Sequence, residues 1–426
     1  MTLHIYNARL LDPASGLDAF GGLIIDGGTI ADVGQHLAAP TNAAETLDAK
    51  GLCLSPGLID LRVKTGEPGE EHRETLATAS RAAVAGGITS MVVMPDTTPV
   101  IDDVALVQFI SNQANATALN RIYPASALTK GLKGESMAEI GLMAEAGAIF
   151  FTNGDNPIPD AGLQKRAMAY AAGCDALIAS RPDERALSGN GVMNSGALAL
   201  QKGLKGMGAD AELIGLQRDI ALAQATNARL LVDNISTQAS LDTLATAKSA
   251  GINVSASISA YSLFFTEDDV GDYLTYCKVN PPFRSENDRK ALIEALKTDL
   301  VDAVTSSHDP QPPENKRLPF AEASFGAAGL ETLLSALLSL VQTCEITLLE
   351  ALRPITSGPA KLLGLDQGQL KTGTPADLIL FDPDQSWLCQ REDLRSRSAN
   401  SPFDGRELVG RVKKTFVAGQ SVFSED

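Results

Sequence analysis

The chain has 426 residues, 44% of them hydrophobic and 20% charged, and its formal net charge at pH 7 is −17. This length can bury a large core and more than one domain. The excess of acidic residues argues against a partner with a phosphate backbone or an anionic membrane surface, so neither nucleic acid nor membrane is expected as a partner.

No window of about 18–20 uncharged apolar residues is present, so no membrane span is predicted. The first residues, MTLHIYNARLLDP, lack the basic and apolar regions of a signal peptide. The five cysteines are scattered and form no CxxC pair, which fits a reducing compartment. A cytoplasmic protein is therefore expected.

Residues 2–50 alternate apolar and polar side chains in short runs, and Gly27-Gly28 marks a tight turn between two of them. This pattern predicts β-hairpins. After Pro359 the chain returns to strand-like runs. We therefore predict a small β-sandwich domain built from both termini, residues 1–50 and 360–426.

Between these segments, short β-branched runs alternate with Ala- and Leu-rich helical stretches. Repeated strand–helix units of this number predict an α/β fold, a (β/α)8 barrel over residues 51–359. The apolar segment 327–342 is predicted as a core helix, with an oligomer interface as the alternative. The eight candidate strands are 57–64, 88–95, 121–128, 148–153, 176–180, 228–236, 253–259 and 302–309.

The first predicted barrel strand lies within Leu52–Gly69, LCLSPGLIDLRVKTGEPG. Side chains alternate along a strand, so Asp60, Arg62 and Lys64 share one face. A metallohydrolase presents a His-x-His pair in this arrangement, but charged Arg and Lys have no lone pair for a metal. The four histidines of the chain, His4, His36, His72 and His308, are far apart in sequence.

The stretch SPGLIDLRVKTGEPG resembles the first barrel strand of the dihydroorotases, members of the amidohydrolase superfamily. MPDTTPVID (94–102), KVNPPFRSENDRKALIEAL (278–296) and LKTGTPADLILFDP (370–383) resemble further motifs of that family. The resemblance implies the barrel and terminal domain predicted above, zinc as the family cofactor, and an active site at the C-terminal ends of the strands.

Carried over residue by residue, the resemblance places other residue types where the family has metal ligands or its catalytic aspartate. His308 is kept, while Gln311 replaces a later histidine and Gly66 stands at the position of a substrate arginine. The replaced positions are Arg62, Lys64, Asn153, Ser180, Asn234 and Ser307. We therefore predict loss of zinc and no confident catalytic residue.

The resemblance then implies the catalytically inactive subgroup of dihydroorotase-like chains. By resemblance, the expected partner is the catalytic chain of aspartate transcarbamoylase, in pyrimidine biosynthesis, within a homodimer or hetero-oligomer. Two alternatives stay open. One is an active dihydroorotase or related cyclic-amide hydrolase with a rebuilt site, and the other is a protein that binds a small anion.

The new cations Arg62 and Lys64 have two interpretations. They balance charge and fill volume left by the metals, or they hold a carboxylate or phosphate. Candidates for lining the same pocket are Asp96, Asn280, His308, Gln311 and Arg284. Adjacent residues on a strand point apart, so a structural role for His308 is preferred over acid–base chemistry with Asp309.

Overall fold

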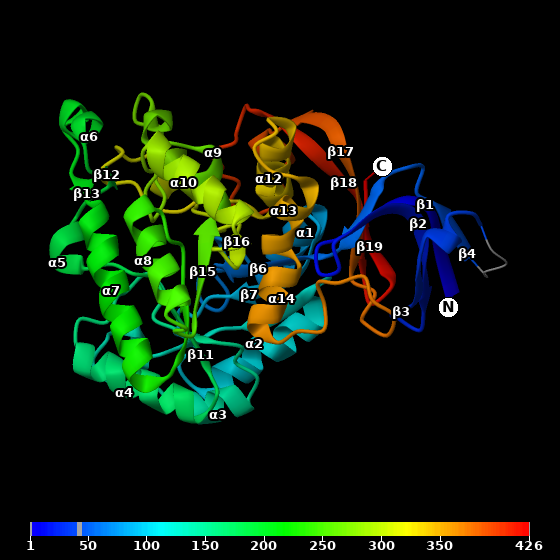
Figure 1. Cartoon of the computed structure of the whole chain (residues 1–426). Helices are drawn as coiled ribbons and strands as arrows, with labels where there is room; N and C mark the ends of the chain where they lie inside the picture. The colour runs from blue at the N-terminus through cyan, green and yellow to red at the C-terminus, as the bar shows by residue number, and fades with distance from the viewer. Residues whose placement is uncertain (1, 41–44, 426) are drawn as a thin grey trace.

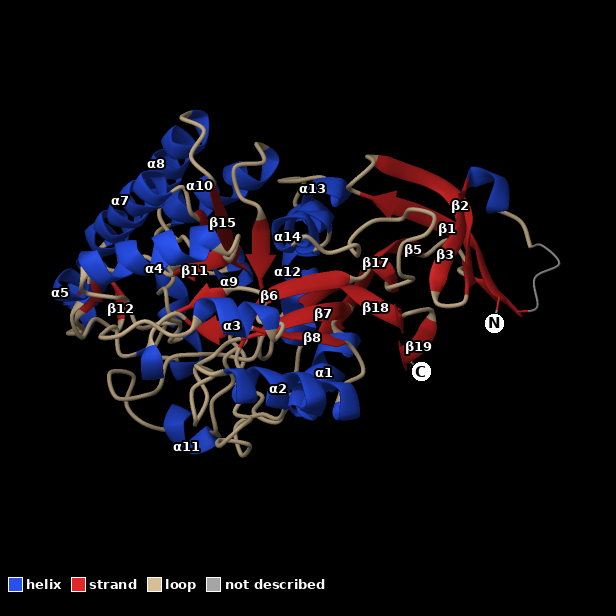
Figure 2. Cartoon of the chain, turned by 90° about the horizontal axis from the view of Figure 1, so that it is seen from below, coloured by secondary structure: helices blue, strands red, loops and turns tan. Residues whose placement is uncertain are grey.

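A computed structural model of the chain describes residues 2–40 and 45–425, and it places a barrel beside a separate sheet (Figures 1 and 2). Within these ranges eight parallel strands follow the eight predicted segments. Hydrogen bonding runs from β6 to β8, continues from β9 to β16, and closes through a bridge between Val63 and His308. The strands are β6 (Leu58–Val63), β7 (Ile88–Val93), β8 (Arg121–Pro124) continued by β9 (Ser126–Ala127), β10 (Phe151–Thr152), β11 (Leu177–Ser180), β14 (Arg229–Val232), β15 (Val254–Ser259) and β16 (Ala303–Thr305).

Helices surround the barrel, and several begin at the side-chain caps that their sequences favour. Thr75 and Ser285 form capping boxes at α1 and α10, and Asp103 caps α2. The longer helices are α1 (Leu76–Ala85), α2 (Val104–Thr117), α4 (Ala161–Gly173), α7 (Ala209–Thr226), α8 (Gln238–Ser249), α10 (Glu286–Lys297) and α12 (Leu333–Gln342). The shorter ones are α3 (Ile140–Glu145), α5 (Arg185–Ser188), α6 (Ala197–Lys202), α9 (Ala260–Phe264), α11 (Pro313–Lys316), α13 (Leu348–Leu352) and α14 (Ser357–Leu363).

Both termini contribute to a second sheet, in the order β19-β18-β17-β5-β1-β2-β3, with β4 paired to β1. The expected turn at Gly27-Gly28 joins β2 and β3, and both glycines have positive φ angles. The strands are β1 (Thr2–Asp12), β2 (Leu17–Asp26), β3 (Thr29–Gly34), β4 (Glu45–Asp48), β5 (Cys53–Pro56), β17 (Leu378–Leu388), β18 (Glu407–Val417) and β19 (Gln420–Ser424). A small two-stranded pair, β12 (Met193–Asn194) and β13 (Gly206–Met207), lies outside both sheets.

Strand β5 belongs to this terminal sheet, although the sequence placed residues 51–359 in the barrel. It pairs with β1 and β17, and the chain enters the barrel only after Gly57. A Cβ at Gly57 would lie 2.2 Å from the side chain of Thr89. Glycine therefore allows the chain to pass from one sheet to the other at this close approach.

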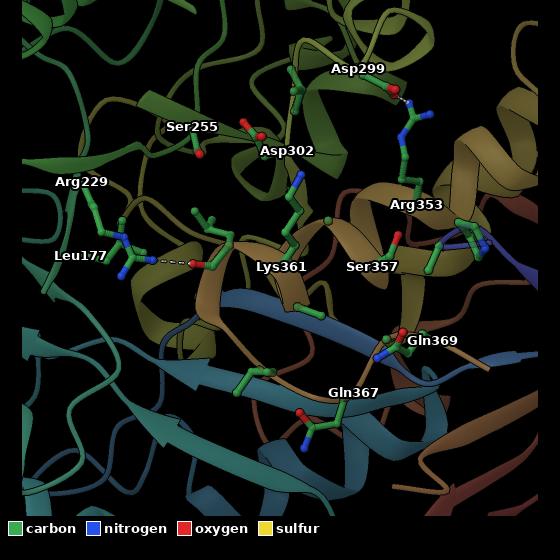
Figure 3. Close-up of a pocket in the computed structure, with 18 of the residues that line it drawn as sticks. Leu177, Arg229, Ser255, Asp299, Asp302, Arg353, Ser357, Lys361, Gln367 and Gln369 are labelled. Carbon is green, nitrogen blue, oxygen red and sulfur yellow. Dashed lines mark hydrogen bonds and ion pairs between the residues drawn. The ribbon is translucent and has the colours of Figure 1, made fainter. Parts of the chain in front are cut away.

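A cavity lies at the N-terminal ends of the barrel strands, beside the segment 357–369 (Figure 3). Its volume is about 600 Å³. It is therefore at the opposite end of the barrel from the strand ends at which the active site was expected.

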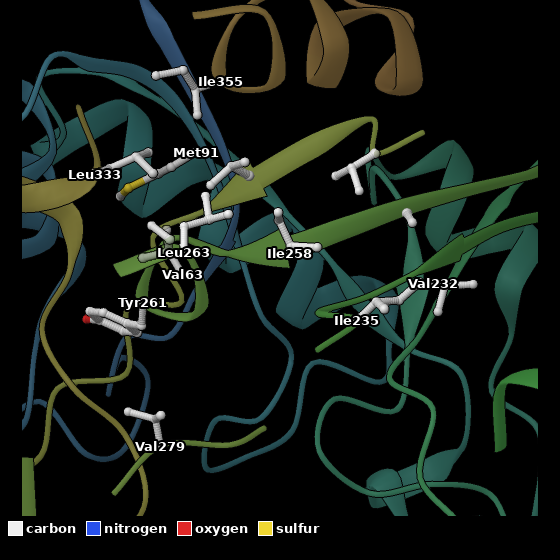
Figure 4. Close-up of a cluster of buried hydrophobic side chains, with 14 of the residues drawn as sticks. Val63, Met91, Val232, Ile235, Ile258, Tyr261, Leu263, Val279, Leu333 and Ile355 are labelled. Atoms are coloured by element: carbon white, nitrogen blue, oxygen red, sulfur yellow. The ribbon is translucent and has the colours of Figure 1, made fainter. Parts of the chain in front are cut away.

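Helix α12 is part of the core, as the sequence predicted for segment 327–342. Leu333, Leu334, Leu337 and Leu338 are buried. Figure 4 shows Leu333 beside Met91 in the apolar cluster that also holds Ile258 of β15. None of the helices in the described ranges is long and apolar enough to cross a membrane.

A buried ion pair joins the barrel to the terminal sheet. The Arg121 guanidinium donates to both carboxylate oxygens of Asp377, at 2.7 and 3.2 Å, and the backbone N–H of Ala418 donates to the same carboxylate. The Asp377 side chain is only 1% exposed. Loss of this carboxylate leaves Arg121 without its partner.

We expect Asp377→Ala to lower the free energy of unfolding by about 3 kcal/mol, because an uncompensated charge stays partly buried. Urea unfolding of wild type and variant measures the difference. The matched control is Asp384→Ala, which removes an exposed carboxylate from β17, the strand that begins directly after Asp377. Equal midpoints for Asp377→Ala and wild type would contradict the role of this pair.

Candidate functional site

Arg62 and Lys64 lie at the barrel mouth, by which we mean the C-terminal ends of the barrel strands. Their side chains share one face, as predicted from strand alternation. Both contact Asp155, with Arg62 Nη2 at 2.8 Å from Oδ1 and Lys64 Nζ at 2.5 Å from Oδ2. Arg181 Nε lies 3.0 Å from the same carboxylate. One carboxylate thus faces three cations.

The Lys64 ammonium is the centre of this cluster. Besides Asp155 it contacts Asp96 Oδ2 at 2.7 Å and Asp309 Oδ2 at 3.3 Å. Burial alone would lower the pKa of Lys64, but the three carboxylates outweigh it and raise that pKa above its usual range. Lys64 is therefore a fixed positive charge enclosed by three carboxylates.

Arg62 is buried and pairs with Asp233 as well as Asp155. Burial alone would lower the pKa of Arg62, and the charges of Asp233 and Asp155 raise it instead. Asp233 also accepts a hydrogen bond from Ser257 Oγ at 2.8 Å. The network therefore connects the ends of β6, β10, β14 and β15.

The other four replaced positions separate into two groups. Asn234 and Ser307 meet directly, with Asn234 Nδ2 donating to Ser307 Oγ at 3.0 Å. Asn153 instead accepts from Thr129 at 2.6 Å, and Ser180 donates to Asp219 at 2.6 Å. Asn153 and Ser180 are therefore hydrogen-bonded away from the Lys64 cluster.

Asn153 still shapes the site indirectly. Its Nδ2 donates to the carbonyl oxygens of Leu132 and Asn156, at 3.2 and 2.9 Å. These hydrogen bonds hold the turn 153–156, and Asp155 lies within this turn. Asn153 thus positions the carboxylate that contacts both Arg62 and Lys64.

The predicted pocket residues are also brought together only in part. Asp96 contacts Lys64 directly, and Gln311 Nε2 donates to Asp309 Oδ1 at 2.8 Å. Asn280 Oδ1 accepts from Arg181 at 3.2 Å.

The candidate Arg284 does not join this cluster. It bonds to Ser236, Asn194 and the carbonyl of Met207. It lines a small neighbouring cavity together with Arg181, Asn234 and Asn280, and none of the hydrogen bonds described for it goes to the Lys64 cluster.

His308 is buried, and its neighbours indicate a structural role. Its Nδ1 accepts from the backbone N–H of Gly329 at 3.2 Å, and its Nε2 lies 3.5 Å from Glu74 Oε2. Its neighbour Asp309 points instead to Lys64 and Arg73. The two adjacent side chains therefore point apart, as strand geometry predicted.

Asp155, Asp233 and Arg181 were not among the predicted site residues, although all three belong to the cluster at the mouth. Each follows a predicted barrel strand or lies near its end, and that position was the available signal. The family motifs point only to the family's own ligand positions, and these three residues lie one or two places away from Asn153, Ser180 and Asn234.

These acids decide between the two interpretations of Arg62 and Lys64. Asp96, Asp155, Asp233 and Asp309 neutralise the cations, so no unpaired positive charge is left to hold an external anion. The free volume at this mouth is about 20 Å³, which is room for about one water molecule. The geometry therefore supports charge balance in the unliganded chain, and an external anion can bind these cations only by displacing one of the carboxylates.

The residues at the mouth do not fit the zinc that the family uses. Among residues 2–40 and 45–425 no group of three or more His, Cys, Asp and Glu side chains is arranged to hold a metal ion. The three carboxylates nearest the expected position converge on Lys64 Nζ instead. We therefore assign no chemical step to a metal, and loss of zinc stays a prediction.

Asp60 lies beneath the cluster and is fully buried. Its carboxylate accepts from the backbone N–H groups of Arg62 and Ser306, at 3.1 and 3.2 Å, and from the Ser306 hydroxyl. Burial raises the pKa of Asp60 to about 6, although these hydrogen bonds oppose the shift.

We expect Asp155→Asn to lower the free energy of unfolding by about 3 kcal/mol near neutral pH, because three cations lose their shared partner. Burial alone would raise the pKa of Asp155, but Lys64, Arg62 and Arg181 hold it well below its usual range. The stabilisation is thus present above about pH 4 and is lost as the pH falls further. Urea unfolding at several pH values measures this. Asp272→Asn, at an exposed site, is the control, and a matching loss there would contradict the prediction.

Asp60 gives the opposite pH dependence. Its folded-state pKa is above the unfolded value, so the contribution of Asp60 to the free energy of unfolding should be lost as the pH rises from about 4 to about 6. The total change is about 3 kcal/mol, since each pKa unit corresponds to about 1.4 kcal/mol. Asp60→Asn should lack this component. If the free energy of unfolding depends on pH in the same way for the wild type and for Asp60→Asn, Asp60 does not titrate in this range.

Family profiles match both halves of the chain. The dihydro-orotase-like family matches residues 51–240, and the amidohydrolase family matches residues 198–422. A protein of Geotalea daltonii named dihydroorotase is 38% identical over 426 residues, covering 100% of both chains. One of Citrifermentans bemidjiense with the same name is 39% identical over 423 residues, covering 99% of this chain and 100% of the relative.

Solved structures confirm the fold. The L-hydantoinase from Arthrobacter aurescens aligns with a TM-score of 0.89 at 25% identity, covering 99% of this chain and 96% of that one. The dihydropyrimidinase from Brevibacillus agri aligns with a TM-score of 0.86 at 22% identity, covering 100% and 95%. The predicted barrel and the β domain from both termini are therefore confirmed.

The full-length relatives correct the functional prediction. Both relatives are named dihydroorotase. They contradict the prediction that this chain is a non-catalytic structural partner from an inactive subgroup. That prediction inferred loss of activity from six replaced positions and gave no weight to the similarity along the rest of the chain. By this similarity over its whole length, the chain belongs to the dihydroorotase family of the amidohydrolase superfamily.

Proposed function

We propose that the chain is a cyclic-amide hydrolase of the dihydroorotase type, which interconverts dihydroorotate and carbamoyl aspartate at a rebuilt site. The observation that carries this proposal is the 38% identity to a dihydroorotase over the full length of both chains. The reaction is the one for which these relatives are named, and the residues to which we assign it lie at the barrel mouth.

Ring opening of a cyclic amide needs positive charge near the carbonyl oxygen and a group that accepts a proton from water. Lys64 and Arg62 are the fixed positive charges at the mouth. Asp96, 2.7 Å from Lys64 Nζ, is the proposed proton acceptor. Asp155 is a poor proton acceptor, because Lys64, Arg62 and Arg181 hold its pKa well below its usual range.

The substrate needs more room than the mouth offers, since the free volume there is about 20 Å³. Asp155 is the natural group to move. Its side chain is 26% exposed, whereas that of Arg62 is 4% exposed. The carboxylate of dihydroorotate would then take over the contacts of Asp155 with Arg62, Lys64 and Arg181.

Partner, assembly and location stay predictions. The resemblance supports association with the catalytic chain of aspartate transcarbamoylase, within a homodimer or hetero-oligomer, and a cytoplasmic location. Co-purification of the two chains from cells tests the association, and separate elution of both would contradict it.

We expect the purified chain to open the ring of dihydroorotate, measured as carbamoyl aspartate by chromatography, and Lys64→Met to abolish this because the central positive charge is removed. Elemental analysis of the same preparation reports its metal content. Lys165→Met, on the exposed face of α4, should keep full activity. Lack of turnover above the buffer rate, with zinc and with a chelator, would overturn the proposed function.

A further inference from the structure

The cavity at the N-terminal face of the barrel is of the size that small-molecule sites have. Its volume of about 600 Å³ lies within the usual range of about 300–1,000 Å³ for such sites. It is lined by the starts of β11, β14, β15 and β16 and by α14 with the loop that follows it, and it is open to solvent. None of the residues of the Lys64 cluster lines it.

Two cations face this cavity without full compensation. Lys361 extends from α14 toward the loop that carries Asp302 (Figure 3), and within the described ranges its ammonium has no hydrogen bond or ion pair. Arg229 donates to the carbonyl oxygens of Leu362 and Asp175, at 3.0 and 3.1 Å. The Asp175 carboxylate lies 3.7 Å from Arg229, but its side chain is 88% exposed, so solvent screens the pair.

The acids of the cavity already have partners. Asp302 accepts from Lys248 Nζ at 2.7 Å and from the backbone N–H of Ala256 at 2.8 Å, and Asp299 pairs with Arg353. The excess charge of the cavity is therefore positive, although the chain as a whole has a net charge of −17. Such a local field attracts anions.

Neutral polar groups in the lining are also available to a ligand. Gln367 Oε1 is buried and has no hydrogen-bond partner, which is costly unless something else satisfies it. Across the described residues, the hydroxyls of Ser255 and Ser357 make no hydrogen bond either. Leu177, Leu230 and Val301 supply apolar surface for the organic part of a ligand.

We propose that this cavity binds a small organic anion through a phosphate or carboxylate group held between Lys361 and Arg229. Both chemistries present the oxyanion that Lys and Arg bind. The site is separate from the barrel mouth, so its occupancy does not depend on the proposed hydrolase activity.

Calorimetric titration of the full chain at low ionic strength with two probes, pyrophosphate and succinate, tests this proposal. We expect saturable binding of at least one probe, weakening as salt is added. Lys361→Gln should weaken it by about tenfold, the effect of one charge-assisted hydrogen bond. Lys361 is exposed and unpaired, so this variant should keep the stability of the wild type.

Lys165→Gln is the matched control, with the same loss of charge at an exposed site on α4. Its affinity should equal that of the wild type. Saturation by pyrophosphate alone would assign a phosphate ligand, and saturation by succinate alone would assign a carboxylate. Two results would overturn the proposal: neither probe saturating at millimolar concentration, or Lys361→Gln binding as tightly as the control.

Discussion

The contact of Lys64 with three carboxylates is the constraint on which the barrel mouth depends. A buried ammonium is costly without partners, and a buried carboxylate is equally costly without a cation. Asp96, Asp155 and Asp309 come from three different strand ends, so the demand for charge neutrality holds those ends together. Arg62 extends the same network to Asp233 on a fourth strand end.

Much of the fold follows from local patterns in the sequence. Runs of β-branched residues located all eight barrel strands, and period-two alternation placed Arg62 and Lys64 on one face. The boundary at β5 was missed because β5 and β6 read as one apolar run. The boundary between β5 and β6 is marked by Gly57, where the side chain of Thr89 approaches the backbone. Thr89 is distant in sequence, so no local pattern indicates this boundary.

The site was less predictable than the fold, for a physical reason. The partners of Lys64 lie 32 to 245 positions away in sequence, and no local pattern reports such distances. Motif comparison identified which residues had changed but not which groups satisfied their charges. Asp155 has no counterpart among the family's motif positions, although it contacts both Arg62 and Lys64.

Overall similarity and local chemistry therefore answer different questions about this chain. Identity over the whole length establishes the family and carries the choice of reaction. The residues of the mouth limit how such a reaction can proceed, because Lys64 stands where carboxylates converge and leaves space for about one water. In the proposed reaction, a substrate that carries its own carboxylate would remove this obstacle without breaking charge neutrality. Its carboxylate would take the place of Asp155, so the cations at the mouth would keep an anionic partner.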